Sequence, residues 1–294
     1  MDVIQLSMLR GVCQMPGYVA LAKGYFLREG LDVRITVAPT AWVVPQRLLA
    51  GEVQFAVMPW TRVAASSAKG EGLVVVCGSG CEEAAIVLRN GIEPEEVRSV
   101  AVPLRGGIKD LTARGLIASL GWDNVEWVRQ PSGDGAIIAF VGRGADAASM
   151  VEPYASMLVG LGMGTVLRRT GDLWPGAPGC SLTTTRRMIE ERPDVVEKLV
   201  RAYVDGARFI EHNPDEASRI ATEYIGIDPK FIRESLHHCR PNVHAFHNRD
   251  SVASVLGLMK ELGYVDRIPE GFLDGSFLEK IAPGLALNGK VAVR

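Results

Sequence analysis

Hydrophobic positions in this chain fall in short runs whose spacing alternates between that of strands and that of helices. Near the N-terminus the pattern predicts strands at 3–9, 31–37 and 53–59, with helices at 19–30 and 41–50 between them. Strands that alternate with short helices are typical of parallel sheets joined by right-handed crossovers. The chain is therefore predicted to be an α/β protein.

Three loops follow these first strands and are expected to meet. They contain Cys13, Thr40–Trp42 and Pro59–Arg62. In open α/β sheets, ligands bind beyond the carboxyl ends of the strands, where loops lead into helix N-termini. We expect the three loops to converge on one cleft.

The alternation continues and then starts again after a polar, turn-rich connection at 90–97. Before the connection we predict a helix at 60–69 and strands at 73–77 and 84–89. After it, the predicted elements are strands at 99–103, 124–128, 145–150 and 180–185, and helices at 108–120, 136–142, 154–161, 193–212, 214–224, 229–238, 249–262 and 274–281.

A faint internal echo indicates two similar lobes. LLAGEVQFAVMP at 48–59 matches FVGRGADAASMVEP at 140–153, since in both a helix ends at glycine and a strand leads into a proline-bearing loop. We expect crossovers near 89–98 and 180–186. Residues 1–90 with 184–294 are then predicted to form lobe one, and 91–183 lobe two.

Several stretches resemble one protein family. They are KGYFLREGLDVRI, LLAGEVQFAV, GRGADAASMVEPYASML and TTTRRMIEERPDVVEKLVRAYVDGARFIEHNPDEA. Together they are similar to the nitrate/sulfonate/taurine-binding and thiamine-pyrimidine-precursor family of solute-binding proteins, over about the whole chain. The resemblance implies a two-lobed, type II periplasmic-binding-protein-like fold. Each lobe would be a mostly parallel sheet flanked by helices, with the ligand cleft between the lobes.

Composition excludes several classes of function. The net charge of −2 gives no reason to expect nucleic acid as a partner, and the sequence holds no run of 18 apolar residues for membrane insertion. Arg10 interrupts the only apolar run at the N-terminus, so no leader is recognised and a cytoplasmic location is expected. The alternative is an extracytoplasmic protein whose leader was trimmed.

The cysteines and histidines suggest no cofactor. Five scattered cysteines do not form a disulfide framework, and the Cys77–Cys81 spacing lacks the second pair of a zinc site. A cluster of histidines with one cysteine invites a metal hypothesis, against a solvated helix end; it comprises His237, His238, Cys239, His244 and His247. Pro241 interrupts any regular helical spacing there, so no metal site is assigned.

The candidate ligand-binding residues come from the loops that should face the cleft. Cys13 could act as a thiolate, Trp42 and Trp60 offer indole faces, and the remaining side chains and glycine amides could bind polar groups. The complete set is Cys13, Met15, Tyr18, Trp42, Trp60, Thr61, Arg62, Arg105, Gly106, Gly107 and Glu152. The alternatives are an incidental thiol, lobe-to-lobe packing, a plain turn at the glycines, and a helix N-terminal charge at Glu152.

Two functions remain open at this point. The resemblance implies a solute-binding protein, monomeric or dimeric, that closes around a small aromatic or anionic ligand (a sulfonate, carboxylate or pyrimidine) and serves an ABC permease. The alternative is a cytosolic enzyme on the same fold, similar to aryl-sulfinate desulfinases, with Cys13 as nucleophile and Arg62 holding an anion. No histidine precedes His212, so a Cys–His pair has no evident base.

Overall fold

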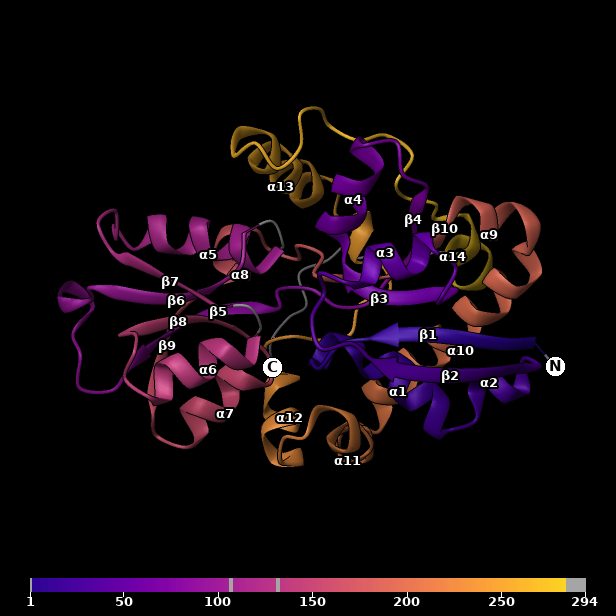
Figure 1. Ribbon diagram of the computed structural model, residues 1–294. Helices are drawn as coiled ribbons and strands as arrows, with labels where there is room; N and C mark the ends of the chain where they lie inside the picture. The colour runs from indigo at the N-terminus through magenta and orange to yellow at the C-terminus, as the bar shows by residue number, and fades with distance from the viewer. Residues whose placement is uncertain (1, 106–107, 131–132, 284–294) are drawn as a thin grey trace.

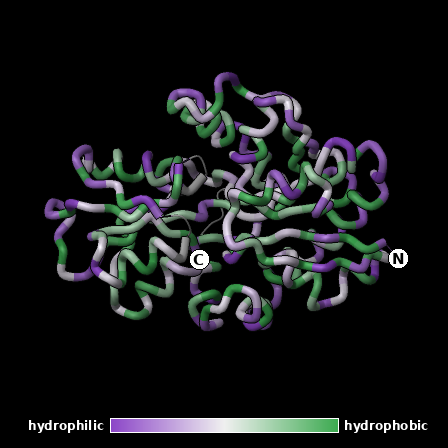
Figure 2. The backbone as a smooth tube through the Cα atoms, viewed as in Figure 1, coloured by the Kyte–Doolittle hydropathy of each residue, from purple (hydrophilic) through white to green (hydrophobic). Residues whose placement is uncertain are grey.

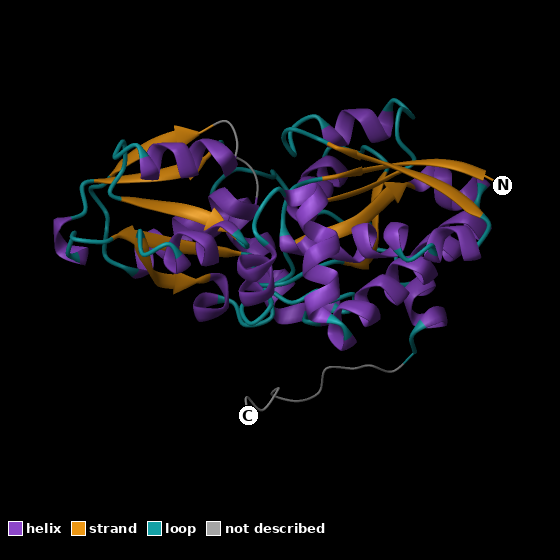
Figure 3. Cartoon of the chain, turned by 90° about the horizontal axis from the view of Figure 1, so that it is seen from below, coloured by secondary structure: helices purple, strands orange, loops and turns teal. Residues whose placement is uncertain are grey.

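The hydrophobic runs form the strands of two sheets. The computed structural model describes residues 2–105, 108–130 and 133–283, and in this part of the chain the strands build two five-stranded sheets, one in each of two lobes (Figure 1). Seen from below, the sheets lie at opposite ends of the molecule with helices around and between them (Figure 3). The predicted two-lobed α/β fold is confirmed.

The first sheet belongs to lobe one and combines four strands from the start of the chain with one strand, β10, that follows the second crossover. Four of its strands run the same way and one, β10, runs against its two neighbours. Its strands β3 and β4 are buried at every position, as their uninterrupted apolar sequences predict. In order of pairing the strands are β2 (Leu31–Val37), β1 (Asp2–Met8), β3 (Phe55–Pro59), β10 (Cys180–Thr185) and β4 (Leu73–Gly78).

The second sheet has the same plan. Again four strands run the same way and one, β5, is antiparallel to its neighbours. The echoed segments form β3 and β8, which hold equivalent third places in the two sheets. In order the strands are β7 (Glu126–Gln130), β6 (Ser99–Pro103), β8 (Ala147–Val151), β5 (Ala84–Arg89) and β9 (Gly164–Arg169).

The chain crosses between lobes earlier than the sequence suggests. β5 was expected in lobe one but lies in the second sheet, between β8 and β9, and β10 lies entirely in the first. The crossovers are therefore the segments 79–83 and 174–179. Apolar content could not show this, because a buried strand has the same pattern in either sheet.

Helices cover both faces of the first sheet. One face packs on α1 and α10, and the other on α3, α4 and α13. The helices of this lobe are α1 (Met15–Ala22), α2 (Tyr25–Arg28), α3 (Val44–Leu49), α4 (Trp60–Ala68), α9 (Arg186–Glu191), α10 (Pro193–His212), α11 (Pro214–Ile225), α12 (Pro229–Ser235), α13 (Arg249–Glu261) and α14 (Ser276–Ile281). Figure 2 shows hydrophobic segments along the sheets and hydrophilic ones mostly on outer helices and turns.

The second sheet has its own helices and two contacts with lobe one. Its helices are α5 (Ile108–Ser119), α6 (Gly133–Val141), α7 (Tyr154–Gly160) and α8 (Thr170–Leu173). On one side α12 packs on α7, and on the other α4 and α13 pack on α5. Short 3₁₀ turns complete the described chain at Val12–Gln14, Pro94–Glu96 and Ala245–His247.

Several details differ from the sequence prediction, which lacked the short helices α8 and α9. The helix expected at 19–30 begins at Met15 and is interrupted at Gly24, whose φ of 69° is left-handed and ends α1. β9 was missed, because its sequence GTVLRR ends in two arginines and it lies at an edge of the sheet.

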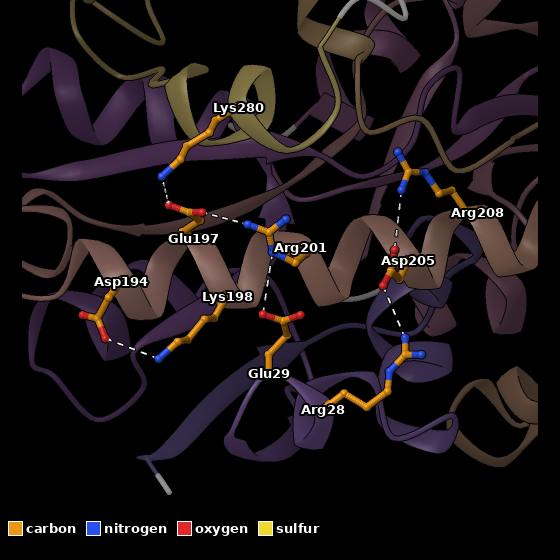
Figure 4. A network of polar contacts seen from close by, with 9 residues as sticks. All are labelled: Arg28, Glu29, Asp194, Glu197, Lys198, Arg201, Asp205, Arg208 and Lys280. Carbon is orange, nitrogen blue, oxygen red and sulfur yellow. Dashed lines mark hydrogen bonds and ion pairs between the residues drawn. The ribbon is translucent and has the colours of Figure 1, made fainter.

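The outer face of α10 is charged and tied to its neighbours (Figure 4). Arg201 pairs with Glu197 at 2.8 Å and with Glu29, which follows α2, at 3.7 Å, and Glu197 also binds Lys280 of α14. Exposed ion pairs contribute little to stability, so this network orients α10 more than it stabilises the fold. Among the described residues no helix is both long and apolar enough to span a bilayer.

Candidate functional site

Arg62 has a charge that no acidic group neutralises within the part of the chain that the structure describes. It lies in the first turn of α4, directly after β3, and it is partly buried. Its Nε atom has no hydrogen-bond partner, and no ion pair involves it in the described chain. Burial lowers the pKa of Arg62 to about 10, so the guanidinium stays charged at neutral pH. A buried, unpaired cation is costly, and an anion would remove that cost.

The guanidinium is held in place by an aromatic ring. Its central carbon lies 3.9 Å from the centre of the Trp42 ring, a cation–π contact. Trp42 follows β2 and remains 44% exposed. Next to Arg62, the Thr61 hydroxyl is fully buried and also lacks a partner. The structure thus brings Trp42 into contact with Arg62, with Thr61 next to it, at the carboxyl ends of β2 and β3.

Trp60, by contrast, does not face a ligand. It is fully buried, with its indole N–H donating to the Pro178 carbonyl oxygen at 2.8 Å. Its ring stacks on Phe272 at 5.9 Å and meets the edge of Phe246 at 5.7 Å. Trp60 therefore packs inside lobe one, and not between the lobes as the packing alternative had it.

Met15 and Tyr18 are also core residues. Both have no exposed surface. The Tyr18 hydroxyl donates to the Leu9 carbonyl oxygen at 2.6 Å, and the ring stacks on Tyr224 at 4.2 Å. Burial raises the pKa of Tyr18 above its ordinary value. These two residues begin and hold α1, since the helix starts earlier than its sequence suggested.

Cys13 is buried beside two residues that are distant in sequence. Donor atoms of Cys13, Glu83 and Cys180 all lie within 4.8 Å of one another. Burial raises the pKa of the Cys13 thiol, and the charge of Glu83 adds to the effect. A nucleophilic cysteine needs a lowered pKa and access, so this position argues against the desulfinase-like alternative.

Glu152 lies on lobe two at the boundary between the lobes. It is 2% exposed, and its carboxylate accepts hydrogen bonds from Arg169 Nη1 at 2.7 Å and from the Ser156 N–H at 3.0 Å. Its carbonyl oxygen accepts from the N–H of Val12 in lobe one at 3.2 Å. The Glu152 charge is therefore compensated within the protein, and its backbone helps to join the lobes.

Arg105 contacts lobe one directly. Its guanidinium donates to the Leu262 carbonyl oxygen at 2.8 Å and lies 5.1 Å from the Tyr264 ring. The neighbouring candidates Gly106 and Gly107 lie outside the described residues.

The buried carboxylate of Asp110 also takes part in the contact between lobe two and the segment after α13. Asp110 of α5 is fully buried and binds Arg129 on its own lobe and the Tyr264 hydroxyl on lobe one. Arg114 Nε donates to the same hydroxyl at 3.1 Å. Tyr264 thus joins the segment after α13 to the first turns of α5.

Tyr264→Phe is expected to lower the free energy of unfolding by about 1.5 kcal/mol, because its hydroxyl bonds to charged groups. Urea denaturation measures the change. Tyr25→Phe is the matched control, since no hydrogen bond involves the Tyr25 hydroxyl in the described chain. Equal effects of the two variants would mean that the hydroxyl contributes nothing specific.

In the described chain the histidine cluster does not bring three donor atoms within 4.8 Å of one another. His244 and His247 have ring centres 5.1 Å apart, and His237 contacts Arg233 instead. Among the described residues, the one group of three donors close enough to share an ion is Cys13, Glu83 and Cys180. His244 lines a cavity of about 690 Å³ between α10 and α12.

His244 should make stability depend on pH. Both ring nitrogens are buried without partners, and burial lowers its pKa, with His247 and Arg208 adding to the effect. The unfolded chain binds this proton near pH 6.5 and the folded chain resists it, so stability falls as the pH drops below about 6.5. His244→Leu is expected to flatten that part of the stability curve, measured by urea denaturation from pH 7.5 to 5. The same dependence of stability on pH in the wild type and in His244→Leu would contradict this role of His244.

Sequence reasoning missed Cys180 and Arg169 as partners of the candidate residues. The pattern placed Cys180 at the start of the strand predicted at 180–185, and it predicted no helix or strand at Arg169. Gly80 and Gly179, within the two crossovers, were the available signal, because a Cβ at either would collide with Cys13 or Glu83.

Comparisons with known proteins give a family and a fold. The sequence model of the NMT1-like family matches residues 3–225. No curated protein sequence matches the chain significantly. Many solved structures are similar, and three of them are described next.

All three structures are similar over most of this chain. The periplasmic nitrate-binding protein NrtA from Synechocystis PCC 6803 has a TM-score of 0.84 and 13% identity, over 97% of this chain and 89% of its own. The ligand-binding component of an ABC-type import system from Staphylococcus aureus, with zinc bound, has a TM-score of 0.83 and 16% identity, over 97% and 100%.

The third structure is the alkanesulfonate-binding protein SsuA from Xanthomonas axonopodis pv. citri, bound to MOPS. Its TM-score is 0.79 and its identity 12%, over 94% of this chain and 99% of its own. At these identities the similarity establishes the fold alone.

Proposed function

Because the chain belongs to the NMT1-like family, we propose that it is a solute-binding protein that holds one small anion between its lobes. The observation that carries this proposal is the unpaired guanidinium of Arg62, stacked on Trp42 at the carboxyl ends of β2 and β3. A cation kept without a counter-ion at that edge of the sheet suits a sulfonate, a carboxylate or a similar anion.

The structural relatives support an anionic solute. Two of them are named for binding nitrate and alkanesulfonate, both of which are anions. The free surface of Trp42 favours solutes with a flat or apolar part next to the charged group. The Thr61 hydroxyl, buried without a partner, is a second group that a solute oxygen could bind.

Lobe closure is the expected means of capture. The crossovers at 79–83 and 174–179 are short, and the lobes meet through separate contacts at Glu152 and Tyr264. A hinge motion at the crossovers would open the boundary by breaking these few polar contacts.

The same comparison supports delivery of the solute to an ABC permease. One relative is named as the ligand-binding component of an ABC-type import system, and another as periplasmic. These names favour an extracytoplasmic location over the cytoplasmic one expected from the sequence. Fractionation of the native cells with an antibody against the chain tests the location.

A panel of defined anions tests the function. The protein is heated with nitrate, ethanesulfonate, benzenesulfonate or benzoate at constant ionic strength, with chloride as the reference. At a hundred times its Kd a solute stabilises the fold by about 2.7 kcal/mol, which raises Tm by several degrees. We expect at least one anion to do so. No shift with any of them would count against an anion-binding function.

Trp42→Ala is expected to weaken binding of that anion by about 2- to 30-fold, because the cation–π contact of about 0.5–2 kcal/mol that positions Arg62 is lost. Isothermal titration calorimetry gives the Kd of both proteins. An unchanged Kd would show that the ring does not position the guanidinium.

A further inference from the structure

Three buried donor groups meet at the crossovers between the lobes. Cys13 follows β1, Glu83 ends the first crossover, and Cys180 begins β10 after the second. Their exposed fractions are 7%, 5% and 3%. One donor atom from each lies within 4.8 Å of the other two, and no other such trio occurs in the described chain.

The spacing of the donors suits a tetrahedral ion. The Cys180 Sγ and Glu83 Oε2 atoms are 3.4 Å apart. Bonds of about 2.3 Å to sulfur and 2.0 Å to oxygen at a tetrahedral angle require a separation of about 3.5 Å. An ion could therefore bridge this pair without movement of the backbone.

The surrounding groups fix the ligands in place. The Cys180 N–H donates to Glu83 Oε1, and Gln14 Nε2 donates to Cys13 Sγ at 3.3 Å. Gln14 is itself fully buried and fixed, since its Oε1 accepts from the Leu9 N–H at 3.0 Å. Hydrogen bonds of this kind orient metal ligands and set their affinity.

Glycines on both crossovers leave the space that Glu83 occupies. A Cβ at Gly179 would lie 2.1 Å from the Glu83 carboxyl carbon, and one at Gly80 would lie 2.8 Å from Cys13 Cβ and 3.3 Å from Glu83 Oε1. Any other residue at these positions would displace the carboxylate or the thiol. The two crossover backbones thus aim the carboxylate at the two sulfurs.

We propose that Cys13, Glu83 and Cys180 bind a thiophilic divalent cation of the zinc class. Two sulfurs and one carboxylate oxygen are a donor set that zinc accepts, and a water or a solute atom takes the fourth position. Each bound thiol releases its proton to solvent, so binding tightens as the pH rises. The ion would connect both crossovers to the loop after β1. This site does not depend on the proposed anion site.

Cobalt titration tests the site directly. The full chain is reduced, treated with a chelator, freed of both reagents by anaerobic desalting and titrated with Co²⁺. We expect one ion per chain, a thiolate-to-cobalt absorption in the near ultraviolet, visible bands of a tetrahedral ion, and displacement by Zn²⁺. Circular dichroism checks the folding of every variant.

The variants separate the ligands from other thiols. Cys13→Ser and Cys180→Ser should each weaken binding at least about tenfold and reduce the thiolate absorption. Glu83→Gln, an isosteric change, should weaken binding but keep that absorption. Cys77→Ser is the control, because Cys77 is buried outside the trio, and it should bind as the wild type does.

Three results would overturn the proposal. They are no saturable binding of Co²⁺, cobalt absorption that survives both Cys13→Ser and Cys180→Ser, and a Cys13–Cys180 disulfide found by mass spectrometry in protein purified without reductant. If a serine variant does not fold, Glu83→Gln decides, since affinity equal to the wild type's would exclude the carboxylate as a ligand.

Discussion

Trp60→Ala is expected to lower the free energy of unfolding by about 3–5 kcal/mol, the range for a large aromatic side chain removed from a core. The ring is fully buried between Phe246 and Phe272, so its loss leaves a cavity that the sheet and α13 cannot fill. The Pro178 carbonyl oxygen also loses its donor.

Because of the position of Pro178, Trp60→Ala is also expected to affect the connection between the lobes. Pro178 belongs to the second crossover, so the Trp60 indole anchors the segment that connects the lobes. Urea denaturation measures the stability. Trp42→Ala is the matched control, and at 44% exposure it should cost no more than the about 0.5–2 kcal/mol of its cation–π contact with Arg62. Equal losses of stability in Trp60→Ala and Trp42→Ala would contradict the expectation that the buried ring of Trp60 contributes more.

Arg62→Met is expected to weaken solute binding by about 10- to 150-fold, which corresponds to the 1.5–3 kcal/mol of a hydrogen bond to a charged group. Methionine has a similar length and no charge. The stability of the solute-free protein should stay the same or rise, because the substitution removes a partly buried charge that has no partner.

Arg62→Lys separates charge from shape. Lysine keeps the positive charge but loses the planar fork that stacks on Trp42. Its affinity should lie between those of the wild type and Arg62→Met, measured by calorimetry with the anion that gives the largest thermal shift. Wild-type affinity in Arg62→Met would remove Arg62 from the binding site.

The order of strands and helices could be predicted because it depends on local patterns. Apolar runs bounded by Gly and Pro marked nearly every strand. The echo between residues 48–59 and 140–153 correctly indicated that β3 and β8 hold equivalent places in the two sheets. Which sheet a strand joins is a tertiary property. β5 is apolar throughout and would be buried in either lobe, so its pattern could not place it.

The candidate site was predicted in part for a similar reason. Arg62 and Trp42 follow strands, and strand ends converge whatever the details of packing. Trp60 differs from Trp42 only in the direction of its side chain, which the core around Phe246 and Phe272 decides. The contact of Cys13 with Glu83 and Cys180 spans both crossovers, and no sequence spacing indicates it.

The most direct test of solute binding is equilibrium dialysis of the protein with the stabilising anion, followed by NMR of the recovered solute. The account predicts saturation at one molecule per chain and recovery of the solute chemically unchanged. Conversion of the solute to a product, or the absence of saturable binding, would contradict it.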